Sequence, residues 1–180
     1  MKTAIYRTGS MSVGFHSYDT LSHWDEFDDR RPVGHVSREE ALFAAPDLRG
    51  GHHWMGYISR RAGCVVFNEI IVESDNVRVC SVDDYNMVGD HYGWPSGEQI
   101  DAINSYWDTS MSLTDWLREV GQDPHGQWEV LLPVHEVISS RVLTYEEIRE
   151  LYLEEGLDDE IMDLDYISAQ LEDGLAALAS

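Results

Sequence analysis

The chain has 180 residues, a length that fits one domain of ordinary size, alone or with an appendage, and that suffices for a self-contained core. Its 34 acidic side chains against 12 basic ones give a formal net charge of −22, and Lys2 is the only lysine. Direct nucleic-acid binding depends on Lys and Arg that neutralise phosphates, so this balance argues against it. Three interpretations of the acidity stay open: a halophile-like surface, a DNA mimic that occupies a basic partner's groove, or plain solubility.

No segment approaches the roughly 20 apolar residues needed to span a bilayer, and Met1 to Arg7 contains no long apolar run. We therefore expect a cytoplasmic protein without a membrane partner. The two cysteines, Cys64 and Cys80, are too few and too far apart for a metal knuckle or a disulfide framework. We expect both to be small buried hydrophobic residues.

Residues 3–7 are predicted to form a first strand that ends at the turn-prone group Thr8, Gly9 and Ser10. Arg7 then stands at the end of this strand. A guanidinium beside a flexible Gly/Ser turn suits a phosphate, because forked donors and free backbone N–H groups come close together. A solvated strand end or an ion-pair partner is the alternative interpretation of Arg7.

Residues 11–32 show no dominant periodicity and are predicted to form a loop or a short helix. Ser37 is followed three residues later by Glu40 and then by helix formers, which is a capping-box signature and predicts a helix over 37–45 that ends at Pro46. Ser37 is thus an N-cap, a role that is compatible with a contact to a ligand.

The middle of the chain alternates between strand-like and helical patterns. The predicted elements are strands at 64–67, 69–72 and 76–82, turn-rich sequence at 83–97, helical sequence at 99–120 interrupted at 109–112, a loop at 121–126, and strands at 127–132 and 137–143.

The strand at 127–132 contains a carboxylate within an otherwise apolar run. Gln127 and Glu129 share one face at a spacing of two, and Pro133 ends the ladder. A polar pair at a strand's exposed rim presents an acid to a cleft, and the alternative is a residue on the wet side of an edge strand. On either interpretation Glu129 is exposed, so Glu129→Gln is expected to leave the melting temperature nearly unchanged.

The segment 144–180 has the pattern of two acidic amphipathic helices. Thr144 and Glu147 form a second capping box, and Gly156 is predicted to end the first helix. The apolar positions are Ile161, Leu164, Leu171, Leu175 and Leu178, joined by Ser168. We expect these helices to form an appendage packed on a domain of residues 1–143, with a partner helix as the alternative contact.

Several chemical classes lack their motifs in this sequence. No histidine pair has the i, i+4 spacing with a following acid, and His52 and His53 would diverge on a strand, so no metal site is expected. The nucleophile elbow G-x-S-x-G, the P-loop and the dinucleotide fingerprint G-x-G-x-x-G are also missing. These gaps argue against a serine hydrolase, an NTPase and a Rossmann enzyme.

The order of the remaining motifs resembles the ADP-ribosyltransferase superfamily, in its arginine–serine–glutamate branch. The matching residues are Tyr6-Arg7-Thr8-Gly9 at the end of the first strand, Val36-Ser37 as the serine motif, and Gln127-Trp128-Glu129 near the end. Thr8 intrudes before Gly9, and the usual Ser-Thr-Ser is His35-Val36-Ser37. The resemblance covers residues 3–143.

This resemblance implies an α+β fold with a split, mostly antiparallel sheet around a cleft, and NAD as a substrate. Glu129 would stabilise the oxocarbenium-like state formed when the nicotinamide–ribose bond breaks, and Gln127 would orient the acceptor. Arg7, Thr8, Gly9, Ser10 and Ser37 would contact NAD, with Arg7 on its phosphate or ribose side. The acceptor of ADP-ribose would be a macromolecule such as a protein.

A different class of function rests on charge. The acidity of the chain and of its C-terminal segment fits a non-enzymatic inhibitor, an acidic decoy for a basic DNA-binding protein of the kind that phages and plasmids produce. A transferase fold without activity, used only for binding, is the third alternative.

Overall fold

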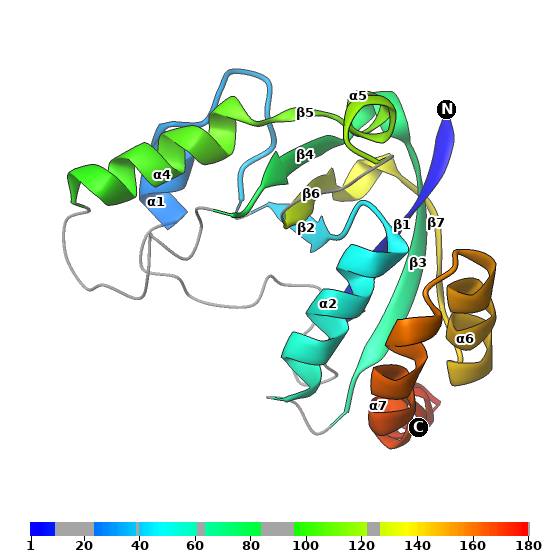
Figure 1. Cartoon of the computed structure of the whole chain (residues 1–180). Coiled ribbons are helices and arrows are strands. Elements are labelled where there is room, and N and C mark those ends of the chain that lie inside the picture. The colour runs from blue at the N-terminus through cyan, green and yellow to red at the C-terminus, as the bar shows by residue number, and fades with distance from the viewer. Residues whose placement is uncertain (10–23, 39, 61–63, 84–95, 122–126, 180) are drawn as a thin grey trace.

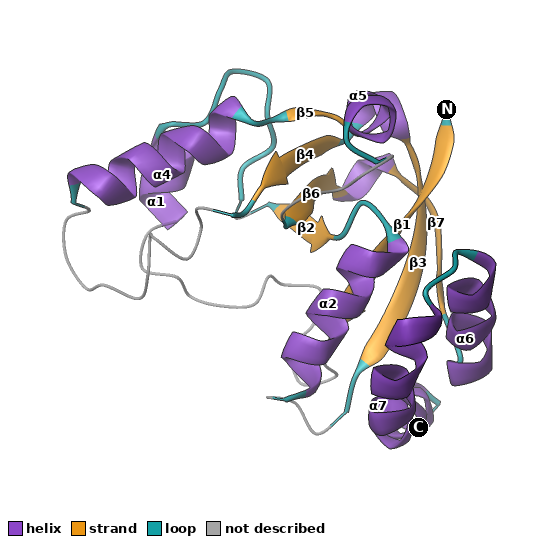
Figure 2. Cartoon of the chain, in the orientation of Figure 1, coloured by secondary structure: helices purple, strands orange, loops and turns teal. Residues whose placement is uncertain are grey.

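A computed structural model describes residues 1–9, 24–38, 40–60, 64–83, 96–121 and 127–179. The fold is α+β, as expected, and the described strands form two separate antiparallel sheets that do not close into a barrel (Figures 1 and 2). No described helix is long and apolar enough to cross a membrane.

The first sheet has three strands in the order β1-β3-β7, and the second has four in the order β2-β6-β4-β5. The strands of the first sheet are β1 Lys2–Gly9, β3 Val66–Glu73 and β7 Val137–Val142. Those of the second are β2 Ala41–Ala44, β6 Trp128–Pro133, β4 Arg78–Ser81 and β5 Met111–Ser112.

Helices flank both sheets (Figure 1). They are α1 Trp24–Asp29, α2 Leu48–Ser59, α4 Gly97–Asp108, α5 Leu113–Glu119, α6 Tyr145–Glu154 and α7 Ile161–Leu178. Short 3₁₀ turns occupy Ser74–Asn76, Val134–Glu136 and Asp158–Glu160, the last of which is η3.

The two sheets meet where β1 passes the end of β2. Tyr6 and Ala45 exchange backbone hydrogen bonds of 3.0 and 2.7 Å in an isolated antiparallel bridge. The end of β1, after Tyr6, therefore lies next to β2, which precedes Ala45. We call this region, around Tyr6 and Ala45, the sheet junction.

The helix predicted over 37–45 is wrong. The backbone N–H of Glu40 does donate to Oγ of Ser37 at 3.1 Å, so the local capping interaction forms. It closes a turn, and Ala41–Ala44 then form β2, which pairs with β6. The helix propensity of this segment is outweighed because the apolar residues of β2 form backbone hydrogen bonds along the whole strand with the apolar strand β6. The helix comes later, as α2, capped by Asp47.

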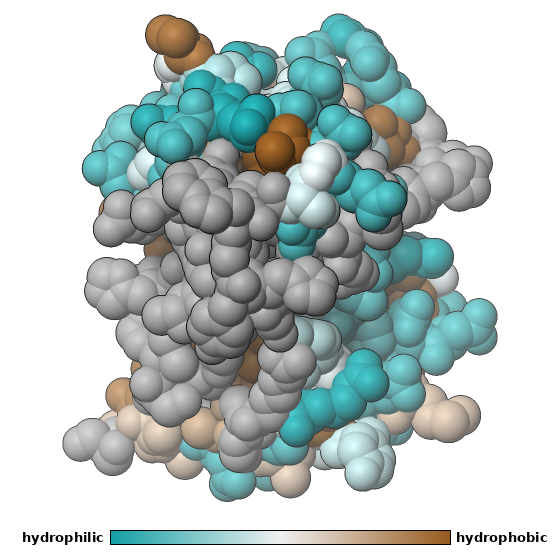
Figure 3. Space-filling model, turned by 90° about the vertical axis from the view of Figure 1, so that its left-hand side faces the viewer, coloured by the Kyte–Doolittle hydropathy of each residue, from teal (hydrophilic) through white to brown (hydrophobic). Residues whose placement is uncertain are grey.

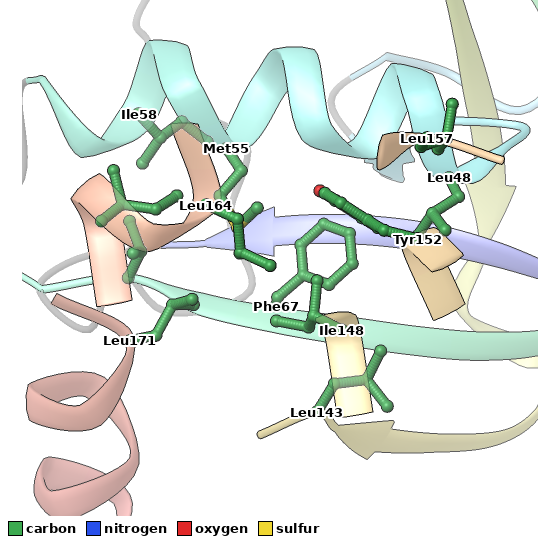
Figure 4. Close-up of a cluster of buried hydrophobic side chains, with 12 residues drawn as sticks. Leu48, Met55, Ile58, Phe67, Leu143, Ile148, Tyr152, Leu157, Leu164 and Leu171 are labelled. Atoms are coloured by element: carbon green, nitrogen blue, oxygen red, sulfur yellow. The ribbon is translucent and has the colours of Figure 1, made fainter. Parts of the chain in front are cut away.

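The C-terminal helices complete a hydrophobic core with α2 and β3 (Figure 4). Phe67 of β3 lies at its centre, with Met55 on α2 and Leu164 on α7 beside it; all three are almost fully buried. Gly174 allows α7 to approach closely, because an added Cβ would lie 2.1 Å from the carbonyl oxygen of Val65. The C-terminal segment 144–179, which we call the tail, is thus packed on the first sheet through an extensive apolar face.

Both expected helix signals of the tail are present. Thr144 and Glu147 form a reciprocal capping box on α6, and Gly156, at φ +69°, follows the last residues of that helix. The buried positions of α7 are Leu164, Ile167, Leu171 and Gly174, whereas Leu178 is exposed. The apolar face therefore ends earlier than the sequence pattern predicts.

Candidate functional site

Glu129 lies in β6 and is only 6% exposed, which contradicts the expected position at an exposed rim. Its backbone is opposite Cys80 of β4, in the interior of the four-stranded sheet. A carboxylate in such a place needs a cation or several hydrogen bonds, since an isolated buried charge is very unfavourable. The structure supplies both kinds of partner.

Arg38 is the cation that faces Glu129. One of its guanidinium nitrogens, Nη1, forms an ion pair with Oε1 of Glu129, and both side chains are more than nine-tenths buried. The same nitrogen lies 2.5 Å from the hydroxyl oxygen of Tyr106 on α4. The Tyr106 hydroxyl in turn donates to Oε1 of Glu129 at 2.5 Å. We call Arg38, Tyr106 and Glu129 the buried triad.

Aromatic rings surround the guanidinium of Arg38. The rings of Phe27, Phe43 and Tyr106 have their centroids 5.0, 4.5 and 4.9 Å from its central carbon. Such rings provide an apolar contact and a cation–π attraction, which partly replace the water that Arg38 has lost. The backbone N–H of Arg38 also donates to Oδ1 of Asp28 at 3.0 Å, which fixes the turn to α1.

Burial keeps Tyr106 and Cys80, two titratable neighbours of Glu129, in their neutral forms. Burial, followed by the charge of Glu129 opposed by that of Arg38, raises the pKa of Tyr106 well above its usual value, so the phenol is neutral and donates. Burial and then the nearby Glu129 raise the pKa of the Cys80 thiol to about 12. Cys80 is therefore a protonated, buried thiol, and not a nucleophile at neutral pH.

Arg38 and Tyr106 both contact the same carboxylate oxygen of Glu129, Oε1. Among the described residues, no hydrogen bond reaches the second carboxylate oxygen, Oε2. A carboxylate held in this way has a fixed orientation and retains an oxygen with acceptor capacity.

Arg7 is half-buried at the end of β1, and its guanidinium reaches the other sheet. Its Nη1 donates to the backbone carbonyl of Phe43 in β2 at 2.8 Å. Burial lowers the pKa of Arg7, and within the described part of the chain no carboxylate lies within ion-pair distance of it. Arg7 is thus a partly desolvated cation whose remaining donors have no anionic partner among these residues.

Phe43 connects the two arginines. Its carbonyl accepts from Arg7, and its ring lies against the guanidinium of Arg38. The sheet junction thereby brings Arg7 and Glu129, which are separated by most of the chain, into one region of connected contacts.

The other predicted site residues have structural partners. Thr8 is buried, with its hydroxyl 3.4 Å from the carbonyl oxygen of Gly51 on α2. Gly9 pairs with Val66, and a Cβ there would make only an ordinary contact, so this position does not require glycine. Ser37 is buried and accepts from Glu40. Ser10 lies outside the described residues.

Gln127 does not share the environment of Glu129, contrary to the expected polar pair on one face. Gln127 is exposed, just before β6 begins. Its backbone N–H donates to Oδ1 of Asp83 at 2.7 Å, and its carbonyl accepts from Val82. The side chain is therefore left at the surface, two residues from the buried carboxylate.

The sequence interpretation missed Arg38 and Tyr106. Both fall inside segments for which the sequence predicted only a helix, 99–120 for Tyr106 and 37–45 for Arg38. A signal existed, because the chain has only 12 basic residues, and a carboxylate inside an apolar strand predicts that one of them is its partner.

No family model, curated protein or solved structure matches this chain. The fold and the site define an α+β protein with a buried Arg–Tyr–Glu triad near the junction of two antiparallel sheets.

Proposed function

We propose that this protein is an ADP-ribosyltransferase-like enzyme that cleaves NAD at the sheet junction and transfers ADP-ribose to a macromolecular acceptor. The observation that carries the proposal is the carboxylate of Glu129, which Arg38 and Tyr106 hold through Oε1 while Oε2 accepts no hydrogen bond from the described residues. A cleft at the split between the two sheets is part of the proposal.

The reaction requires stabilisation of positive charge on a ribose. The bond between C1′ and the pyridinium nitrogen breaks, its electron pair goes to the ring nitrogen, and neutral nicotinamide leaves. Oε2 of Glu129 accepts a hydrogen bond from a ribose hydroxyl and stabilises the oxocarbenium-like sugar. An acceptor nucleophile then bonds to C1′ and releases its proton to solvent.

Arg38 and Tyr106 act on Glu129 and not on the substrate. A carboxylate already oriented by two donors needs no reorganisation when charge develops, which is the basis of electrostatic preorganisation. The nearby guanidinium also weakens the negative field of Glu129, so the stabilisation of the sugar depends on the short distance between Oε2 and the ribose.

Arg7 is the proposed contact for the pyrophosphate of NAD. A partly desolvated guanidinium that has no carboxylate partner among the described residues offers charge-assisted, forked donors to phosphate oxygens. Gln127, exposed beside β6, is the proposed contact for the acceptor. Thr8 and Gly9 at the end of β1, and Ser37 in the turn before β2, would contribute through their backbone geometry, since the hydroxyls of Thr8 and Ser37 serve internal contacts.

The test separates binding from chemistry. NAD is titrated into the ¹⁵N-labelled protein, and nicotinamide release is measured with labelled NAD. Arg7→Ala is expected to weaken NAD binding about tenfold or more, because it removes a charge-assisted contact. Arg78→Ala, at an exposed arginine of β4, is the matched control and is expected to bind NAD like the wild type. Absence of NAD binding to the wild-type protein would disprove the proposal.

Glu129 is tested in a background that preserves the fold. Glu129→Gln alone leaves Arg38 buried without its anion, so loss of activity would be ambiguous. The double variant Arg38→Met, Glu129→Gln removes both charges, and nicotinamide release is expected to fall by about two to three orders of magnitude in folded protein. Wild-type rates in that variant would contradict the role of Glu129.

The acidic decoy is the second candidate, and the exposed acids of the tail favour it. Residues 144–180 contain the single basic residue Arg149 among many acids, including the exposed run Asp158 and Asp159. Figure 3 shows a different face, the one that lies at the left in Figure 1, and hydrophilic residues make up much of its described surface. The exposed acids of the tail fit recognition by charge, and binding to a basic protein that weakens steeply with salt, without NAD binding, would favour this candidate.

A further inference from the structure

Away from the sheet junction, three metal-ligating side chains converge where α2 meets the tail. Nε2 of His52 lies 3.1 Å from Oε2 of Glu160 and 4.0 Å from Oδ2 of Asp163. The three donor atoms all lie within 4.8 Å of one another. His52 comes from α2, Glu160 from η3 and Asp163 from the first turn of α7, so the cluster joins segments more than a hundred residues apart in sequence.

We propose that His52, Glu160 and Asp163 bind a divalent transition-metal cation of the zinc type, which fastens the C-terminal helices to α2. One imidazole and two carboxylates form a mixed nitrogen and oxygen set, which suits Zn²⁺ better than Mg²⁺ or Ca²⁺, whose ligands are oxygens. Two carboxylates also balance the charge of a divalent ion.

The distances are close to those of a metal site. Bonds of about 2.0–2.2 Å to one ion separate neighbouring ligand atoms by roughly 3.0–3.5 Å. The pair His52 and Glu160 already has this separation. Asp163 must approach by less than about 1.5 Å by the same geometry, and its side chain is 80% exposed, so it is free to turn.

The histidine is held as metal-binding histidines are. Its Nδ1 lies 2.9 Å from the hydroxyl of Tyr152, and its ring packs edge-on against that of Tyr152. When Nδ1–H donates to the tyrosine oxygen, Nε2 presents its lone pair on the side of the two carboxylates, and a ring N–H donated to a neighbouring acceptor is typical of metal-binding histidines. Figure 4 shows the Tyr152 side chain running beneath α2, so the orienting group itself belongs to the core.

The sequence prediction of no metal site rests on the missing i, i+4 histidine pair and on His52 and His53 diverging on a strand. They lie on α2, where His52 faces inward with Leu48, Met55 and Ile58, and His53 is exposed. One histidine is therefore available, and its partners come from the far end of the chain, which no local motif reveals.

A metal-free sample tests the proposal. The full chain is treated with a chelator, freed of it, and titrated with Zn²⁺ by calorimetry, with Mg²⁺ as the comparison ion. We expect one Zn²⁺ per chain and a rise in melting temperature with Zn²⁺ but not with Mg²⁺, since a ligand that binds only the folded state stabilises it. The visible absorption of Co²⁺ in the same site should report nitrogen and oxygen ligands.

Matched variants assign the site. Asp163→Asn and Glu160→Gln are each expected to weaken Zn²⁺ binding about tenfold or more, and Tyr152→Phe by about tenfold through the orientation of His52. Asp173→Asn, at an exposed acid two to three turns further along α7, is the control and should bind as the wild type does. The proposal is overturned if Zn²⁺ fails to bind stoichiometrically, or if Asp163→Asn and Glu160→Gln both bind it with wild-type affinity.

Discussion

The sheet junction and the interface between α2 and the tail each contain a cluster of ionisable side chains, but the two clusters differ in their exposure to water. At the junction, Arg38 and Glu129 are enclosed, with side-chain exposures of 5% and 8%. At the tail, Glu160 and Asp163 are 31% and 80% exposed, and only His52 is buried. The buried charges of Arg38 and Glu129 stabilise each other in place of water, whereas the carboxylates of Glu160 and Asp163 remain hydrated.

This difference determines what each cluster contributes to stability. A buried ion pair contributes little relative to an apolar pair of similar volume, yet the loss of one partner leaves the other charge stranded. An exposed pair contributes little, and its loss costs little. The tail is instead held by apolar packing of α7 and α6 on β3 and α2.

The largest expected effect comes from breaking the buried triad. Glu129→Gln should lower the free energy of unfolding by about 3–5 kcal/mol, because Arg38 stays charged and buried without its anion. This replaces the expectation from sequence that the melting temperature barely changes. Adding Arg38→Met should recover most of the loss, since the glutamine still accepts from Tyr106 and methionine packs well among the rings of Phe27 and Phe43. Urea denaturation measures both values.

An exposed pair provides the control for this cycle. Arg118 and Glu119 form an ion pair with side-chain exposures of 66% and 58%. Glu119→Gln should change the free energy of unfolding by no more than about 0.5 kcal/mol. If Glu129→Gln is equally mild, Glu129 is not held in a closed ion pair.

The second effect tests how closely the tail packs. Gly174→Ala places a methyl group 2.1 Å from the carbonyl oxygen of Val65, so α7 must move away from the start of β3. Overpacking of this kind costs about 1–3 kcal/mol. Gly97→Ala is the control, because the first position of α4 has open space around it and alanine favours a helix. Equal stability of the two variants would contradict the close approach of α7.

Sequence patterns predicted the elements whose signals are local. The capping box of Thr144 and Glu147 and the stop at Gly156 depend on neighbouring residues and agree with the structure. The strand predicted over 3–7 is also present, but it continues through Thr8 and Gly9, for which a turn was predicted, because both pair with β3. The strands predicted at 64–67 and 69–72 form instead one strand, β3, because Asn68 continues the ladder opposite Arg7.

Long-range partners were not predictable in the same way. The period-two pattern identified Glu129 as a carboxylate within an apolar strand. It could not show whether the side chain faces solvent or the interior, because that depends on the strands on both sides of β6. Arg38 is 91 residues from Glu129 and lies in a turn where sequence suggested a helix. The partner strand β6 makes β2 a strand, and that pairing is invisible to any local window.

A smaller effect is expected from the group that orients His52. Tyr152→Phe in metal-free protein retains the ring in the core and removes only the hydroxyl that contacts Nδ1. The loss should be about 1 kcal/mol, the usual net contribution of one hydrogen bond. Tyr106→Phe, in which the hydroxyl contacts a buried charge, should cost more, about 1.5–3 kcal/mol. A reversed order would show that the tail cluster, and not the triad, is the more enclosed of the two.

The smallest effect is expected at Asp163. In metal-free protein, Asp163→Asn removes a carboxylate that is 80% exposed and 4.0 Å from Nε2 of His52, so the free energy of unfolding should change by no more than about 0.5 kcal/mol. With saturating Zn²⁺ the wild type should gain stability that the variant gains only at higher Zn²⁺ concentrations, because the variant has lost one ligand. Urea denaturation with and without Zn²⁺ measures the difference, and Asp173→Asn serves again as the control. A large loss for Asp163→Asn without any metal would mean that Asp163 is an essential partner of His52 in the free protein, and the contrast between a closed junction and a solvated tail cluster would then be wrong.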